Sequence, residues 1–84
     1  MSAFTVEIRV MPRASLLDPQ GQAVEHALAA LGFGAVGSVR MGKALTVSLR
    51  AESPEAAREQ VQAMCRRLLA NPVTEDYLLE VEES

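Results

Sequence analysis

The chain has 84 residues, of which 49% are hydrophobic and 23% charged, and its formal net charge is −3. This length predicts one domain, residues 1–84. The chain has a single Cys, which excludes an intrachain disulfide. One Cys and one His are also too few ligands for a structural zinc site. The acidic balance argues against nucleic-acid binding, and the sequence shows neither an apolar run near 18 residues for a membrane span nor a secretory signal.

The first predicted element is a strand over residues 3–11. Its apolar residues alternate with polar ones, and they are Phe4, Val6, Ile8 and Val10. A period of two is typical of a strand with one buried face, so these four residues are predicted to point into the core.

A helix is predicted over residues 19–31. Asp18 can cap its free N–H groups, and Pro19 suits the first helical position. Its apolar stripe, which we expect to pack on the sheet, consists of Val24, Ala27, Leu28 and Leu31. Gly32 or Gly34 can end the helix in a left-handed conformation.

Two further strands are predicted over residues 36–41 and 44–50. Gly42 and Lys43 between them form a two-residue hairpin turn in this interpretation. In the second of these strands Leu45, Val47 and Leu49 alternate with Thr46, Ser48 and Arg50.

Ser53 and Pro54 repeat the cap-plus-proline start and predict a second helix, which Asn71 and Pro72 end. Its apolar stripe consists of Ala57, Val61, Met64, Cys65 and Leu68, and Leu69 falls off it. Residues 75–82 alternate again, with Tyr77, Leu79 and Val81 on one face and Leu78 on the other.

This order predicts an α+β fold, a ferredoxin-like βαββαβ sandwich of a four-stranded antiparallel sheet with two helices on one face. The open sheet face is then polar, and it can be solvated or stack on another sheet in an oligomer. Leu69 and Leu78 are candidates for contacts between chains, although each can equally be an isolated exposed Leu. The apolar content of so short a chain also favours an oligomer or a partner.

No catalytic apparatus is predicted. Cys65 lies on an apolar stripe, which is typical of a buried thiol acting as a small hydrophobe, and a lone thiol fits a cytoplasmic protein. His26 lies on the polar side of its helix, and the sequence has no phosphate-binding loop. Gly21 stands in a helical first turn against its propensity, which indicates either a close approach of another backbone or a tolerated glycine at a fraying end.

Three blocks resemble one known family. They are LDPQGQAVEHAL at residues 17–28, VRMGK at 39–43, and LLANPVTEDY at 68–77 with the acidic end Glu80-Val81-Glu82. In this order and spacing they resemble PurS, the small subunit of phosphoribosylformylglycinamidine (FGAM) synthase. One departure is Thr74, where the family often has an apolar β-branched residue.

The resemblance implies a non-catalytic role in de novo purine biosynthesis. In that complex a large subunit, which uses ATP and Mg²⁺, converts formylglycinamide ribonucleotide to formylglycinamidine ribonucleotide with ammonia from glutamine, and releases ADP and phosphate. A glutaminase subunit supplies the ammonia with its own Cys-His chemistry and releases glutamate. The small subunit carries no cofactor and, as a homodimer or homotetramer, bridges the other two and supports ammonia transfer.

The resemblance gives the candidate interface residues provisional roles, beside which a local role as cap, turn or helix stop stays open for each. Asp18, Pro19 and Gly21 shape a docking edge. Arg40, Gly42 and Lys43 form a positive hairpin tip for an acidic partner. The corner that enters the last strand consists of Asn71, Pro72, Asp76 and Tyr77.

Two rival functions share this predicted fold. A regulatory module that binds a small molecule at a dimer interface has the same architecture, so the fold alone does not separate the two. An RNA-binding sheet would need stacking aromatics on its open face. Phe4, Phe33 and Tyr77 are the aromatic residues here, and they fall on or near the inward pattern.

Overall fold

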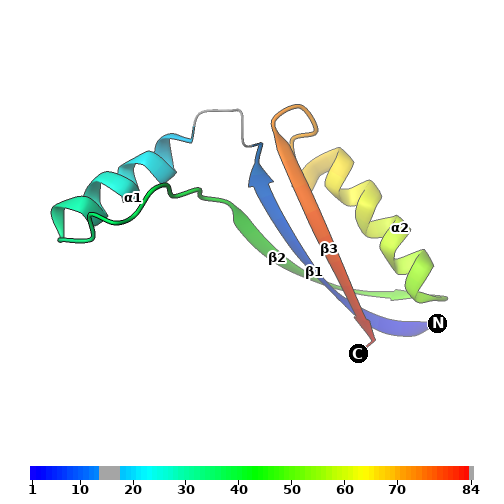
Figure 1. Ribbon diagram of the computed structural model, residues 1–84. Helices are drawn as coiled ribbons and strands as arrows, with labels where there is room; N and C mark the ends of the chain where they lie inside the picture. The colour runs from blue at the N-terminus through cyan, green and yellow to red at the C-terminus, as the bar shows by residue number, and fades with distance from the viewer. Residues whose placement is uncertain (14–17, 84) are drawn as a thin grey trace.

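The structure is a computed structural model that describes residues 1–13 and 18–83, so Leu17 of the first motif lies outside the described residues. An antiparallel sheet has the strand order β2-β1-β3, and one helix packs on it while another projects away (Figure 1). The elements are β1 (Ser2–Pro12), α1 (Pro19–Ala30), β2 (Lys43–Ala51), α2 (Pro54–Met64), the π-helical turn η1 (Cys65–Leu69) and β3 (Glu75–Glu83). None of these helices is long and apolar enough to cross a membrane.

The central strand β1 supplies most of the core. Its register pairs Val6 with Val47 on one side and with Val81 on the other, so it has a neighbour along both edges. The predicted inward residues of β1 are all buried, and they are Phe4, Val6, Ile8 and Val10. A strand flanked on both edges and covered on one face buries every second residue, as the alternation predicts.

Helix α2 covers the inward face of the sheet and begins where the sequence predicts. The Ser53 Oγ accepts a hydrogen bond from the Ala56 backbone N–H at 3.1 Å, and Pro54 occupies the first turn. Ala57 and Val61 are buried against the sheet. The cap and the proline therefore set the start of the helix, and its apolar stripe sets its orientation.

The π-helical turn η1 changes which leucine reaches the core. The Ala70 N–H donates to the Cys65 carbonyl at 3.0 Å, a spacing of five residues that widens the turn. As a result Leu69 packs against the core with Cys65, while Leu68 is 83% exposed. The prediction that placed Leu68 on the buried stripe and Leu69 off it is wrong, because it assumed α-helical periodicity to the end of the helix.

The predicted α+β class and antiparallel sheet are confirmed, but the fourth strand is not. Residues 36–42 form no strand, and the described residues contain three strands. The predicted hairpin at Gly42 and Lys43 is also wrong, because residues 36–42 form no strand and Lys43 instead begins β2 and pairs with Val10 of β1. The apolar pattern of 36–41 is real, but an extended segment becomes a strand only where a neighbour offers its edge.

Helix α1 does not pack on its own sheet, which corrects the prediction of two helices on one face. With the returning segment 31–42 it forms a projection, residues 18–42, that we call the arm (Figure 1). Gly32, with φ of +101°, turns the chain at the tip, as the sequence predicts for one of its two glycines. Leu31 of the predicted stripe is 74% exposed, and the molecule extends over 52 × 26 × 14 Å.

Candidate subunit interface

Asp18 fastens the base of the arm. One carboxylate oxygen accepts the Gly21 N–H at 3.0 Å, and the other accepts the Met41 N–H at 2.7 Å. These bonds, first that from Met41 and then that from Gly21, hold the pKa of the Asp18 carboxyl below its ordinary value of 3.8, and the charge of Arg40 adds to them. Asp18 is therefore an N-cap that also ties the start of α1 to the segment returning from the tip.

Gly21 is the buried residue of α1, and its place decides between the two interpretations of this glycine. A Cβ at Gly21 would overlap the Val39 carbonyl oxygen and crowd the Asp18 carboxylate. Glycine is required here because the backbone of the returning segment crosses the first turn of the helix at close range. Pro19 precedes it in the first turn and is exposed.

Gly42 and Lys43 join the arm to the sheet. A Cβ at Gly42 would overlap the Val10 carbonyl oxygen and the Met11 sulfur, so glycine permits the chain to pass tightly over the end of β1. Lys43 pairs with Val10 as the first residue of β2, and its side chain is exposed, as is that of Arg40. The predicted positive tip is therefore a basic junction between arm and sheet.

The corner before β3 is held by its own polar groups. The Asn71 Oδ1 accepts the Val73 N–H at 2.9 Å, and the Asn71 N–H donates to the Glu75 carboxylate at 2.7 Å. Arg13 donates to the Pro72 carbonyl at 2.8 Å and lies 3.5 Å from the Asp76 carboxylate. Through these bonds Asn71, Pro72 and Asp76 stabilise the corner itself, which is the local structural role that the sequence analysis left open as the alternative to an interface role.

Tyr77, Leu78 and Leu69 lie at different depths. Tyr77 and Leu69 are half-buried and pack against the core, so neither offers its whole side chain to a partner. Leu78 is 69% exposed and lies opposite Arg9 on the open face, as predicted. Of these three residues, Leu78 is the one that presents most of an apolar side chain to solvent.

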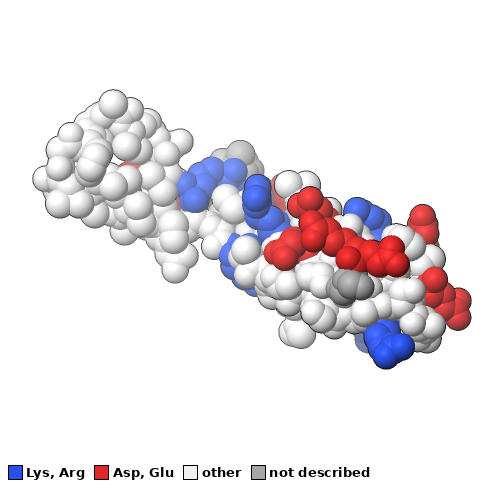
Figure 2. Space-filling view, turned by 90° about the horizontal axis from the view of Figure 1, so that it is seen from below, with Lys and Arg blue, Asp and Glu red and all other residues white. Residues whose placement is uncertain are grey.

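Most of the candidate residues gather at one end of the sheet. Met11 pairs with Asp76, Val10 pairs with Lys43 and Tyr77, and Asp18 reaches this end through Met41. Figure 2 shows Lys and Arg side chains gathered where the arm meets the sheet, Asp and Glu side chains over the sheet, and few charges along the arm. Three separate sequence blocks thus meet at one basic end.

Two features of this end and of the arm lie outside the sequence predictions. Arg13 ties the end of β1 to the corner before β3, and no local pattern in the sequence indicates these distant partners. The arm also exposes large apolar side chains, which are Leu31, Phe33, Val36 and Met41. The high hydrophobic content of the sequence indicated that apolar side chains would be exposed, but composition does not say where on the molecule they lie.

The single thiol and the single imidazole of the chain lie in different surroundings, one buried and one exposed. Burial raises the pKa of the Cys65 thiol above its ordinary value of 9.0, which keeps it protonated and unreactive at neutral pH. His26 is exposed on α1, in the arm, and Cys65 lies in the core at the start of η1. Across residues 1–13 and 18–83, the structure contains no group of three or more His, Cys, Asp or Glu side chains arranged to hold a metal ion.

Residues 5–83 match the family model described as "PurS: Phosphoribosylformylglycinamidine (FGAM) synthase". The chain belongs to the PurS family. It is 42% identical over 80 residues to the phosphoribosylformylglycinamidine synthase subunit PurS of Bacillus subtilis, an alignment that covers 95% of this chain and 94% of the relative. The PurS subunit of Methanocaldococcus jannaschii is 38% identical over 83 residues, with 99% of this chain and 98% of the relative covered.

Solved PurS structures share the whole fold, including the arm. The crystal structure of Methanocaldococcus jannaschii PurS superposes with a TM-score of 0.86 at 33% identity, covering 96% of this chain and 98% of that chain. A chain in the structure of PurLQS from Thermotoga maritima superposes with a TM-score of 0.85 at 37% identity, covering 100% of each chain. The projecting arm is thus part of a fold that family members share.

Proposed function

We propose that this chain is the small subunit of phosphoribosylformylglycinamidine synthase in purine biosynthesis, and that it joins the large amidating subunit to the glutaminase subunit. The observation that carries the proposal is the family match over residues 5–83, together with full-length similarity to a chain of a PurLQS assembly. The chemistry of the described residues supports it, since the buried Cys65 and the exposed His26 lie apart. On this proposal the chain contributes no catalytic group and holds no cofactor, and ATP and Mg²⁺ act on the large subunit.

Reconstitution tests this proposal. Glutamine-dependent amidation is measured with the large and glutaminase subunits alone and again after addition of this chain, with ammonia-dependent amidation as the control. We expect this chain to raise the glutamine-dependent rate and to have no glutaminase or ATPase activity by itself. Equal rates with and without the chain, or substantial turnover by the purified chain, would contradict the assignment.

We also propose that the chain works as a homo-oligomer whose arm lies against a second copy. Its radius of gyration is 16.4 Å, against about 12 Å for a compact domain of this length. It exposes 5971 Å², whereas a compact monomer of 9.0 kDa exposes about 4,900 Å². The difference of about 1,100 Å² exceeds the roughly 800 Å² that each partner buries in a standard interface.

The basic junction is the surface that we propose for an acidic partner subunit. Reversing its charge with Arg40→Glu and Lys43→Glu should weaken assembly with the partner subunits more than it affects folding, because both side chains are exposed. Co-purification at low and high salt measures assembly, and thermal unfolding measures stability. Arg58→Glu on the outer side of α2 is the matched control, and unchanged assembly of the double variant would refute the role of the junction.

A further inference from the structure

Both ends of α1 are fixed by residues that lie next to them in the chain. Asp18 caps the start, as described above. At the other end the Gly32 N–H donates to the Ala29 carbonyl at 3.1 Å, and the Phe33 N–H donates to the Leu28 carbonyl at 2.9 Å. With Gly32 at positive φ, these two bonds form a Schellman cap. The helix therefore begins and ends where its own sequence directs.

Between these ends, α1 has little to hold it. Gly21 is the buried residue among its twelve, and neither hydrophobic cluster of the core includes a residue of the arm. A helix of this length is marginal by itself, because its hydrogen bonds barely offset the entropy lost when its backbone is ordered. The burial of Ala57 and Val61 stabilises α2, whereas the glycine that α1 buries has no side chain to contribute.

The segment that returns from the tip makes few backbone hydrogen bonds. Among the described residues, those of Gly34–Met41 join the Val36 N–H to the Phe33 carbonyl at 3.3 Å and the Met41 N–H to the Asp18 carboxylate at 2.7 Å. Phe33 and Val36 are also 58% and 40% exposed. The base of the arm is therefore fastened, while its outer part, residues 22–38, depends on weak local contacts.

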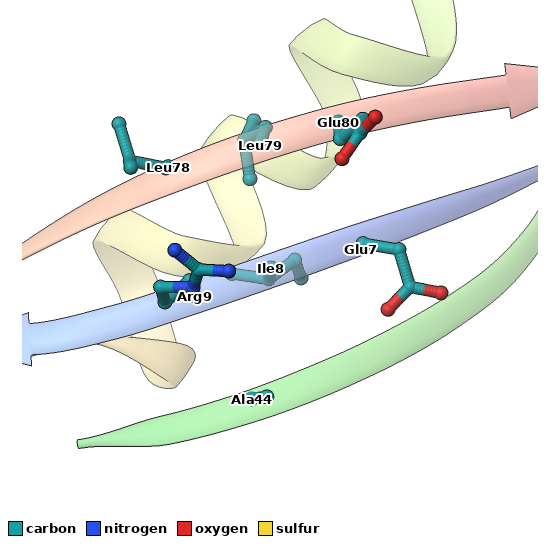
Figure 3. Close-up of a pocket in the computed structure, with 7 residues that line it drawn as sticks. All are labelled: Glu7, Ile8, Arg9, Ala44, Leu78, Leu79 and Glu80. Atoms are coloured by element: carbon teal, nitrogen blue, oxygen red, sulfur yellow. The ribbon is translucent and has the colours of Figure 1, made fainter. Parts of the chain in front are cut away.

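The sheet differs from the arm in this respect. β1 is paired along both edges, and α2 lies behind it, as Figure 3 shows around the hollow that Glu7, Arg9 and Leu79 line. Even this open face keeps its backbone hydrogen bonds without a cover, because they run from strand to strand. Local stability is thus uneven along the chain, high in the sheet with α2 and low in the outer part of the arm.

We propose that the outer part of the arm folds only when it lies against a second copy, while the base and the sheet stay folded in the free chain. This inference rests on the arm pairing proposed above and adds that pairing and folding of the arm are one step. The second copy then supplies the cover that the chain does not give to Val24, Leu28 and Leu31. Each free chain opens at its arm, so the arm distinguishes an unpaired subunit from a paired one.

The open arm makes an unpaired subunit sensitive to proteases. A protease needs a locally unfolded segment as well as an exposed side chain, so chymotrypsin should cut after Leu28, Leu31 or Phe33 in the free chain. Leu68 is an internal control, since it is 83% exposed but belongs to a turn that packs on the core. We expect cleavage in the arm below the concentration at which copies dissociate, protection above it, and no cleavage at Leu68 in either state.

Amide hydrogen exchange measures the same opening without a protease. Light scattering first locates the concentration at which copies dissociate, and exchange is then followed on either side of it. In the free chain we expect the amides of Leu31, Gly32 and Phe33 to exchange within about tenfold of the rate of an unstructured chain. The amides of Gly21 and Met41, which donate to Asp18, should stay protected in both states.

A change of helix propensity separates this inference from a preformed arm. His26→Ala and His26→Gly remove the same exposed side chain from α1 and differ by about fivefold in the helix equilibrium. Two arms fold in each pair, so the dissociation constant of the Gly variant should exceed that of the Ala variant by roughly twentyfold. In a preformed arm the propensity acts equally on free and paired chains, and the two constants would be equal.

Glu59→Ala and Glu59→Gly are the matched control pair in α2, which packs on the sheet of its own chain. They should differ in melting temperature and have equal dissociation constants. Equal constants in the His26 pair, or an arm protected to the same degree at both concentrations, would overturn this inference alone. A chain that stays monomeric at every concentration would overturn the arm pairing as well.

Discussion

The carboxylate of Asp18 accepts two backbone hydrogen bonds, one from the Gly21 N–H and one from the Met41 N–H. An asparagine offers one acceptor oxygen in place of two, so Asp18→Asn should lose one of these bonds and loosen the base of the arm. We expect faster amide hydrogen exchange at Gly21 and Met41 in this variant. Glu25→Gln, further along α1, is the control, and equal exchange rates in Asp18→Asn and wild type would contradict the role of Asp18.

The lowered pKa of Asp18 also gives this fastening a pH dependence. A carboxyl whose pKa is lower in the folded chain stabilises the fold fully above its ordinary value of 3.8, and the contribution is lost as pH falls through the lowered pKa. The arm should therefore stay fastened throughout the neutral range and loosen in acid below that value. In Asp18→Asn the exchange at Met41 should lack this acid transition.

Gly21 tests whether the close crossing in the arm matters more than helix propensity. Ala is about 1 kcal/mol better than Gly inside a helix, so propensity alone predicts that Gly21→Ala stabilises α1. We expect the opposite, a lower melting temperature, because the new Cβ overlaps the Val39 carbonyl. Gly34→Ala is the matched control, since no atom lies within 4 Å of a Cβ there. A higher melting temperature for Gly21→Ala would contradict this prediction, because it would mean that the Val39 backbone moves aside at little cost.

At the scale of an element, the π-helical turn makes two adjacent leucines unequal. Leu69→Ala should lower the free energy of unfolding by about 1–2 kcal/mol, roughly half the cost of a fully buried leucine, because Leu69 is half-buried against the core. Leu68→Ala should change it by less than about 0.5 kcal/mol, because Leu68 lies in solvent. Urea unfolding of the two variants measures both values. The reverse order would mean that the helix stays α-helical to its end in solution.

Helices and strands that depend on neighbouring residues could be predicted from the sequence. The surfaces against which they pack could not. The alternation of β1 and the Ser53-Pro54 start of α2 depend on neighbouring residues, and the structure confirms both. The segment 36–41 has strand character without a strand beside it, and the stripe of α1 is amphipathic without facing its own sheet. Periodicity identifies a face that needs covering, but it does not say which surface, or which copy of the chain, covers it.

The candidate interface divides in the same way. Asp18 and Gly21 could be singled out because a cap and an ill-suited glycine are visible in sequence, and the structure explains both by one close crossing. Arg13 could not, because its partners Pro72 and Asp76 lie about sixty residues away along the chain. Leu69 is buried in place of Leu68 because of one π-helical turn, and no pattern in the sequence predicts that turn.

At the scale of the whole molecule, the arm determines the assembly that we expect. Leu31→Asp with Phe33→Asp places two charges on residues that are 74% and 58% exposed, so the isolated fold should tolerate them. If the arm lies against a second copy, the double variant should dissociate at concentrations where wild type stays assembled, because a buried unpaired charge is costly. Light scattering measures the mass. Val73→Asp, equally exposed but outside the arm, is the control, and a wild-type mass in the double variant would contradict arm pairing.

The central position of the first strand also sets the order in which the molecule can fold during synthesis. Phe4 pairs with Leu49 and with Glu83, so β1 leaves the ribosome before both of its neighbours, and its second edge is closed only when β3 has followed. Such distant pairings are slow to form, and until then an apolar strand is open to the wrong neighbour. Nascent chains therefore depend on rapid completion, and a stalled or shortened product that lacks β3 should aggregate rather than persist as a smaller folded unit.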